Sequence, residues 1–201
     1  MTDLFKEKAK DWDVSDRARQ LSTGIGTAIL ENVVLTPNMD VLDFGAGTGL
    51  ITSQIAPFVK SVTAVDVSES MLDKLRAKVE LNKKVVVICQ DITADPLGQK
   101  YDLVMSAMAM HHVKDTDNML KQFSQHLKEG GQIALADLDA EDGSFHKEGT
   151  QGVFHNGFDR EEFSKALVKE GFSQIRYLTA YTVIGEKGSY PVFLVLANKG
   201  G

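Results

Sequence analysis

Residues 41–50 read Val-Leu-Asp-Phe-Gly-Ala-Gly-Thr-Gly-Leu, and the interpretation of the whole chain starts from this stretch. The apolar residues before Gly45 predict a buried parallel strand, and Leu50 with Ile51 predicts the start of a helix. Glycines at alternate positions between the two predict a tight turn, in which a ligand can lie against bare main chain at a helix N-terminus. The stretch is therefore interpreted as a strand, a glycine turn and the first turn of a helix.

Two carboxylates accompany this glycine turn. Asp43 lies two residues before Gly45, and the next apolar run, residues 61–65, ends in Asp66. A carboxylate at the carboxyl end of a neighbouring strand can accept hydrogen bonds from both hydroxyls of a ribose. The spacing Gly-x-Gly-x-Gly differs from the Gly-x-Gly-x-x-Gly of dinucleotide-binding turns. The turn therefore predicts a nucleoside ligand other than a dinucleotide.

Composition limits the class of protein and of partner. The chain has 201 residues and a formal net charge of −6, with no run of five like charges, so a nucleic-acid partner is not expected. No stretch approaches the roughly 18 apolar residues of a membrane-spanning helix, and the N-terminus has no apolar leader, so we expect a soluble, cytoplasmic protein without membrane contact. The single cysteine, Cys89, lies in an apolar run and is expected to be buried and inert. The sequence carries no signal for an oligomeric state.

Strand-like and helix-like segments alternate along most of the chain. The pattern predicts strands at 61–66, 85–89, 101–105, 132–136, 172–184 and 190–197, and helices within 3–34, from Leu50 to Pro57, over 68–80, around Met119–Leu127 and after Asp159. We expect Gly130-Gly131 to stop the fourth of these helices and Asp159 with Glu162 to form a capping box. Such alternation predicts a doubly wound, mostly parallel α/β sheet with helices on both faces. Residues 1–201 are expected to form one domain, with a helical cap at 1–36 and a lid loop at 138–157.

The glycine turn, its two acids and the strands that follow in order resemble class I S-adenosylmethionine-dependent methyltransferases over nearly the whole chain. The N-terminal Phe5-x-x-x-Ala9-x-x-Trp12-Asp13 resembles a segment found in the small-molecule and quinone-type branch, which is methyltransferase-11/25-like. The resemblance implies a seven-stranded, Rossmann-like sheet of order 3-2-1-4-5-7-6 with the last strand antiparallel. It also implies S-adenosylmethionine as cofactor and a small molecule as methyl acceptor, whose oxygen, nitrogen or carbon nucleophile is left open.

The same resemblance implies roles for individual residues. Asp43 would bind the cofactor's amino group, Asp66 its ribose diol and Asp91 its adenine amine, while Trp12 would cover the cofactor or, alternatively, pack under the first helix. The full set of implied cofactor-binding residues is Trp12, Asp43, Gly45, Ala46, Gly47, Thr48, Asp66, Val67, Met71, Asp91, Ile92, Ser106, Ala107 and His111. An Asn-Pro-Pro-Tyr motif is absent after the strand at 101–105, which disfavours amide and adenine amino groups as acceptors.

Histidines gather in the segments expected to form the acceptor side. Four of the five lie within 106–113 or 138–157. Histidine is the natural general base near neutral pH, so one of His111, His146 and His155 is predicted to be the catalytic base or to orient the acceptor. For each histidine alone, the alternative is a loop residue that bonds to the backbone.

Two further alternatives concern the chemistry. A divalent metal could be held by Asp137, Asp139, Asp142 and His146, although the sequence favours a site without a metal. The chain could also be a binding or sensor protein that keeps the cofactor pocket without catalysis. An NAD(P)-dependent reductase fits less well, because of the glycine spacing and the closing pair of strands.

Overall fold

The structure is a computed structural model that describes residues 3–200, so residues 1, 2 and 201 of the predicted domain lie outside the described part. The strands are β1 (Asp40–Phe44), β2 (Ser61–Asp66), β3 (Val85–Cys89), β4 (Tyr101–Ala107), β5 (Leu127–Leu138), β6 (Phe172–Ile184) and β7 (Ser189–Lys199). The helices are α1 (Lys6–Ala9), α2 (Asp16–Asn32), α3 (Leu50–Ile55), α4 (Glu69–Arg76), α5 (Thr116–His126) and α6 (Arg160–Lys169). Short 3-10 turns are η1 (Trp12–Val14), η2 (Ala56–Phe58), η3 (Val79–Leu81) and η4 (Met110–His112).

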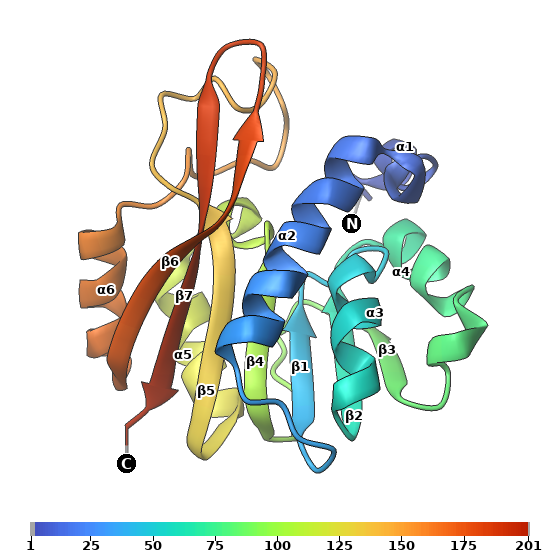
Figure 1. The fold of residues 1–201 in the computed structure, drawn as a ribbon, viewed down its shortest axis with the longest axis vertical. Helices are drawn as coiled ribbons and strands as arrows, with labels where there is room; N and C mark the ends of the chain where they lie inside the picture. The colour runs from blue at the N-terminus through green and yellow to red at the C-terminus, as the bar shows by residue number, and fades with distance from the viewer. Residues whose placement is uncertain (1–2, 201) are drawn as a thin grey trace.

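All seven strands form one sheet in the order β3-β2-β1-β4-β5-β7-β6 (Figure 1). The pairs from β3 to β5 are parallel, and β7 runs antiparallel to both β5 and β6. Helical crossovers explain the parallel part, while the short turn between β6 and β7 makes the last pair antiparallel. The predicted strand order and the antiparallel last strand are therefore confirmed.

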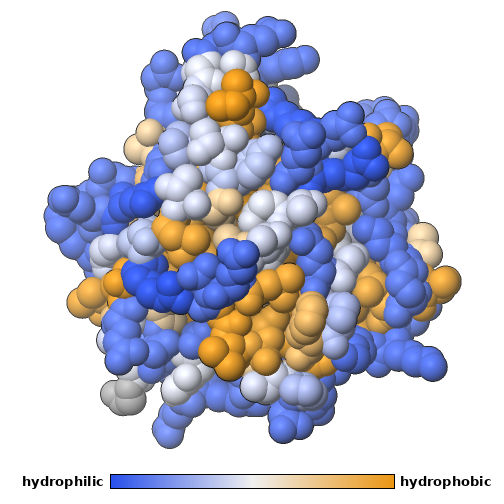
Figure 2. Space-filling view, viewed as in Figure 1, coloured by the Kyte–Doolittle hydropathy of each residue, from blue (hydrophilic) through white to orange (hydrophobic). Residues whose placement is uncertain are grey.

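Helices cover both faces of the sheet, as predicted. Side chains of α2, α3 and α4 share one buried cluster with one face, and side chains of α5 and α6 share a second cluster with the other. Alternation along the strands divides the two cores: Val41 belongs to the first and its neighbour Leu42 to the second. Figure 2 shows the face of Figure 1, which is hydrophilic around its margin with hydrophobic residues below the centre of the view.

The glycine turn follows β1 as predicted and is attached to β2. The backbone N–H groups of Gly45 and Ala46 both donate to the carbonyl oxygen of Val65, at 2.8 and 3.0 Å. Gly49, with φ of +80°, forms the N-cap of α3, and a Cβ there would lie 2.3 Å from Leu75 Cδ1. Position 49 thus needs glycine both for its left-handed backbone and for the close approach of α4.

The N-terminal region is mostly helical, as predicted. Within residues 3–34 the chain forms α1, η1 and then α2, which begins after Ser15 because the Ser15 hydroxyl accepts a hydrogen bond from Ala18 N at 3.3 Å. Within residues 3–200, no helix is both long enough and apolar enough to cross a bilayer. A cytoplasmic location stays a prediction.

Cys89 is exposed, so the prediction of a buried thiol is wrong. It ends β3, which is the edge strand of the sheet and pairs only with β2. An apolar run of this kind is usually buried on both faces, but the outer face of an edge strand can be left uncovered. Val86, the second residue of the run, is likewise exposed, at 57%.

Helix α5 ends at His126, four residues before the predicted glycine stop at Gly130-Gly131. The ammonium group of Lys199, on β7, donates to the carbonyl oxygens of Ser124 and Leu127 at 2.7 and 3.1 Å. A cation at these last carbonyls favours a helix end there. Gly130, with φ of +69°, lies instead inside the irregular start of β5.

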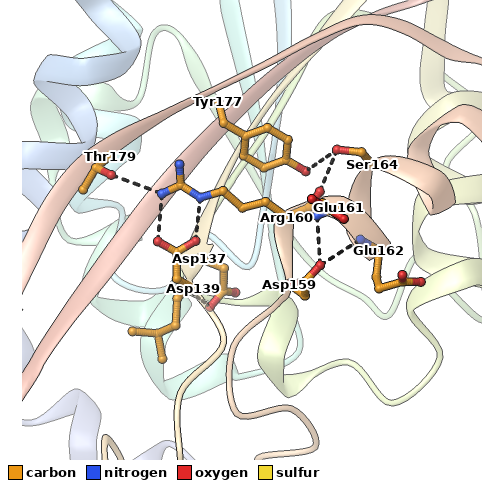
Figure 3. A network of polar contacts seen from close by, with 10 residues as sticks. Asp137, Asp139, Asp159, Arg160, Glu161, Glu162, Ser164, Tyr177 and Thr179 are labelled. Atoms are coloured by element: carbon orange, nitrogen blue, oxygen red, sulfur yellow. Dashed lines mark hydrogen bonds and ion pairs between the residues drawn. The ribbon is translucent and has the colours of Figure 1, made fainter.

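Residues 139–157, here called the lid loop, contain no helix or strand, and their two ends are bound together. Phe158 N donates to Leu138 O at 2.9 Å, and the guanidinium of Arg160 donates to both carboxylate oxygens of Asp139 at 2.7 Å (Figure 3). Asp159 accepts from Glu161 N and Glu162 N and so caps α6, which is the first half of the predicted capping box. The Glu162 carboxylate accepts from Lys165 at 2.6 Å, instead of from Asp159 N as a capping box requires. The lid loop therefore leaves the sheet and returns to it at one fixed point.

We predict that Gly49→Ala lowers the free energy of unfolding more than Gly171→Ala does. Both glycines have a positive φ, +80° and +87°, which costs alanine roughly 1–2 kcal/mol. Only at position 49 would the new methyl group overlap another side chain, which adds about 1–3 kcal/mol of overpacking. Urea unfolding followed by circular dichroism measures both variants, and equal losses would contradict the packing argument.

Candidate active site

A cavity of about 880 Å³ lies at the carboxyl ends of β1, β2 and β4. Its lining comes from the β1–α3 turn, the ends of β2 and β3, the loop after β4, the lid loop and the N-terminal segment between Phe5 and Ile25. This is the edge at which open α/β sheets bind ligands, because the strand order reverses there between β1 and β4. The segments predicted to form the site therefore meet at one cavity.

Asp43 lines this cavity at the end of β1 and is only 2% exposed. Thr52, on α3, donates its hydroxyl to Asp43 Oδ2 at 2.5 Å. Burial raises the pKa of the Asp43 carboxyl to about 7, the Thr52 hydrogen bond opposes this shift, and the nearby Asp66 adds to it. A positively charged ligand beside Asp43 would favour the ionised form, so the site is suited to an amino group or another cation.

Asp66, at the end of β2, holds the glycine turn through its carboxylate. Its Oδ2 accepts from Gly47 N and its Oδ1 from Ser68 N, both at 2.8 Å. Burial raises the pKa of Asp66, and these backbone hydrogen bonds oppose that shift. Each carboxylate oxygen can still accept a further hydrogen bond, so Asp66 can bind hydroxyl groups of a ligand while it holds the turn.

Asp91 follows β3 and lines the cavity from the next strand. Its Oδ1 accepts from both Thr93 N and Thr93 Oγ1, at 2.9 and 2.6 Å, which fixes the carboxylate in a local turn. Two other predicted cofactor contacts, Ile92 and Ser106, are buried and are not part of the cavity lining. Ile92 belongs to the second buried cluster, so it packs behind the lining of the cavity.

The other predicted cofactor-binding residues line the cavity, namely Trp12, Gly45, Ala46, Gly47, Thr48, Val67, Met71 and Ala107. At Gly47 the backbone faces open space, since a Cβ built there would meet no atom within 4 Å. The hydroxyl of Thr48 is buried and has no hydrogen-bond partner in the described part of the chain. A buried hydroxyl without a partner is costly, so it is suited to bond a ligand.

On the β4–β5 side, His111 and Asp137 form a buried pair. His111 Nδ1 lies 2.7 Å from Asp137 Oδ1, and His111 N donates to Asp137 Oδ2 at 3.1 Å. The two side chains are 2% and 0% exposed. An ionised carboxylate only accepts hydrogen bonds, so Nδ1 would donate to Asp137, and in a neutral imidazole of this tautomer the lone pair is on Nε2. His111 lines the cavity, so this pair is arranged as a base and its orienting acid.

His112 and His146 lie beside His111. The ring centroid of His111 lies 4.1 Å from that of His112 and 5.0 Å from that of His146. Burial, and then the neighbouring His111, lowers the pKa of each to about 4. His112 Nδ1 lies 2.6 Å from Gly152 O in the lid loop. Both rings are therefore neutral near pH 7 and contribute polarity to the cavity without charge.

His155, the third predicted base, is not part of the cavity lining. Its Nε2 lies 2.9 Å from Val113 O and 3.2 Å from Thr116 Oγ1, and its ring packs 5.2 Å from that of Phe158. These contacts attach the end of the lid loop to the start of α5. These contacts favour the alternative interpretation of His155, a loop residue bonded to the backbone, over the role of catalytic base.

The side chains of the metal alternative do not gather around one point. Asp137 is engaged by His111, and both oxygens of Asp139 are engaged by Arg160. Within residues 3–200, no group of three or more histidine, cysteine, aspartate or glutamate side chains has the arrangement of a metal site.

Several contacts among cavity residues have no signal in the sequence. Phe5 lies edge-on to His112 with ring centroids 5.1 Å apart, and the Arg17 guanidinium lies 4.8 Å from the centroid of the Phe145 ring. These contacts join the N-terminal segment to η4 and to the lid loop. A local pattern such as helix amphipathicity cannot indicate pairs so far apart in the chain.

Comparison with known proteins agrees with this geometry. A sequence model of the methyltransferase domain family matches residues 41–131. An uncharacterized methyltransferase of Geobacillus sp. (strain WCH70) is 30% identical, over 88% of this chain and 84% of that protein. One of Schizosaccharomyces pombe is 32% identical over 59% of this chain, which matches only 48% of the yeast protein.

Among solved structures, a Clostridium acetobutylicum S-adenosylmethionine-dependent methyltransferase has the same fold, with a TM-score of 0.70, 21% identity and coverage of 98% of this chain and 99% of that one. A doubly wound sheet by itself serves many chemistries. The bacterial relative, the domain match and the antiparallel last strand together identify the family. The chain belongs to the class I S-adenosylmethionine-dependent methyltransferases.

Proposed function

We propose that this protein transfers a methyl group from S-adenosylmethionine, the cofactor of its family, to a small-molecule acceptor. The observation that carries the proposal is one cavity with three acids on its β1–β3 side, of which Asp43 is buried, and the His111–Asp137 pair on its β4–β5 side. Its volume of about 880 Å³ lies in the upper part of the range of small-molecule sites, roughly 300–1,000 Å³, and so has room for a cofactor and a small acceptor. In this proposal the chain acts as one methyltransferase domain.

For the cofactor, each acid has a distinct part to bind. Asp43 would accept from the amino group, because its buried carboxyl is stabilised by a cation. Asp66 would accept from the ribose hydroxyls with the lone pairs that Gly47 and Ser68 leave free. Asp91 would accept from the adenine amine, and Trp12 would cover the cofactor from η1.

For the reaction, the cofactor supplies a methyl group that a sulfonium has already activated. The protein's own part is to align the acceptor with that methyl group, since orientation lowers the barrier to in-line displacement. As the acceptor atom bonds to the methyl carbon, its proton would pass to His111 Nε2, while the electron pair of the breaking carbon–sulfur bond stays on sulfur. Asp137 would stabilise the imidazolium that forms, and its hydrogen bond fixes the tautomer.

We expect Asp66→Asn to weaken S-adenosylmethionine binding by roughly 10- to 100-fold, because a neutral amide replaces a carboxylate that accepts several hydrogen bonds. Isothermal titration calorimetry measures the affinity. The control is Asp73→Asn, which removes an exposed acid whose recorded partner is Arg76 on the same helix. Equal affinities of the two variants, both still folded, would remove Asp66 from the cofactor site.

We expect His111→Gln to lower kcat by roughly 10²- to 10⁴-fold while the affinity for S-adenosylmethionine stays within a few-fold, because the base acts on the acceptor. Formation of S-adenosylhomocysteine with phenols, carboxylic acids and amines as acceptors gives the rate. His155→Gln is the matched control and should keep its kcat, since that ring bonds to Val113 O. Cofactor binding by the wild-type protein without turnover on any acceptor would favour a binding or sensor protein.

A further inference from the structure

Cationic side chains gather at one part of this cavity although the chain as a whole carries a net charge of −6. Lys8 comes from α1, Arg17 from the first turn of α2 and Lys147 from the lid loop, and all three line the cavity. Within residues 3–200, none of the three takes part in a recorded ion pair. Their charges are therefore not neutralised by the protein's own carboxylates.

The neighbours of two of these cations behave differently. Lys10, two residues after Lys8, pairs with Glu7 at 2.6 Å, and Arg19, two residues after Arg17, pairs with Asp16 at 2.5 Å. Glu7 and Asp16 thus pair with cations that do not line the cavity. The two helices thus keep their paired charges outside and present Lys8 and Arg17 unpaired to the cavity.

Five rings lie between Lys8 and Arg17 in a continuous chain of contacts, which we call the aromatic band. Its members, with successive centroids 5.1, 4.1, 5.0 and 4.9 Å apart, are Phe5, His112, His111, His146 and Phe145. The Lys8 ammonium lies 5.3 Å from the Phe5 centroid at one end, and the Arg17 guanidinium lies 4.8 Å from the Phe145 centroid at the other. The band thus offers aromatic surface, made of three imidazoles between two phenyl rings, with a cation at each end.

Lys8 and Arg17 also affect the pKa of His146, which lies within the aromatic band. After burial and His111, the charges of Lys8 and Arg17 are among the causes that hold the pKa of His146 low, while Asp137 opposes them. Asp137 is 0% exposed and is already bonded to His111 and Leu138 N. The acid on this side is therefore not available to the cations, and an additional anion would be favoured.

The acids that line the cavity lie elsewhere. Asp43, Asp66 and Asp91 come from the ends of β1 to β3, and Asp115 caps α5 by accepting from Asn118 N at 2.9 Å. The cavity thus has acids where the cofactor's amino group, diol and adenine would bind, and unpaired cations around the aromatic band. The acids match the amino and hydroxyl groups of the cofactor, whereas the cations around the band match an anionic group.

From this arrangement we propose that the methyl acceptor is an organic anion whose carboxylate or phosphate group is bound by Lys8 and Arg17, with its carbon skeleton against the aromatic band. The inference rests on the proposed function, because it names the substrate class of that site. Arg17 can bind an oxyanion through two N–H groups, and Lys8 supplies a mobile point charge. The anion would hold the acceptor while His111 Nε2 faces its nucleophile.

The test measures binding rather than turnover, so it does not require the natural acceptor. Benzoate, phenyl phosphate and neutral benzamide are titrated into the wild-type protein, with and without S-adenosylhomocysteine, and followed by ligand-observed NMR. We expect at least one of the two anions to bind at least tenfold more tightly than benzamide. Which anion binds more tightly distinguishes a carboxylate acceptor from a phosphate acceptor. Raising the salt concentration should weaken the binding of the two anions and leave the binding of benzamide unchanged.

The decisive variant is Lys8→Gln with Arg17→Gln, for which we expect at least a tenfold loss of anion affinity and an unchanged affinity for S-adenosylhomocysteine. The matched control is Lys10→Gln with Arg19→Gln, which removes the same two charges from the same two helices outside the cavity and should bind the anions like wild type. Arg17→Lys keeps the charge but loses the planar contact with Phe145, so retained anion binding would attribute the effect to charge rather than to lid packing.

Three results would overturn the inference. Two of them are binding of benzamide as tight as that of both anions, and anion binding by the double variant at wild-type affinity. Absence of binding by both anions would do the same. Absence of S-adenosylhomocysteine binding by the wild-type protein would instead contradict the proposed function. The two failures can be told apart, because the anions are also titrated without S-adenosylhomocysteine.

Discussion

The carboxylate of Asp66 is the contact on which the rest of the site depends. It bonds to the glycine turn through Gly47 N and to the start of α4 through Ser68 N, so two segments that follow different strands are held at one sheet edge. The Val65 carbonyl, which accepts from Gly45 N and Ala46 N, strengthens the same junction. Because the pair of strands and the turn are fixed in this way, the buried acids can meet a ligand without reorganisation.

A single strand end organises the opposite side of the cavity. Asp137 and Asp139 lie two residues apart at the end of β5; the first orients His111, and the second receives the guanidinium of Arg160 (Figure 3). The orientation of the imidazole and the attachment of the lid loop are therefore set by neighbouring positions. A shift of this strand end would alter both, which links the packing of β5 between β4 and β7 to the geometry of the site.

Local sequence patterns determine the cofactor side much better than the acceptor side. The glycine turn and the position of Asp66 at the end of β2 follow from an apolar run and its punctuation, and the structure has both. The exposure of Cys89 depends on its strand being the sheet edge, and the position of His155 depends on a partner, Val113 O, contributed by another loop. Contacts such as Arg17 with Phe145 join segments far apart in the chain, so periodicity and motif spacing contain no information about them.

Because the two ends of the lid loop are bound together, the sequence of the loop can vary without altering the sheet. Residues 41–131, which match the domain family, end before this loop begins, and the two ends of the loop are joined to each other at Leu138, Asp139 and the start of α6. Lengthening a loop whose ends are already joined costs little, about 0.6 kcal/mol for each doubling of its length. A lid of another length or sequence can thus join the same strand end, so the acceptor-facing part of the cavity can change while the glycine turn and its acids stay as they are.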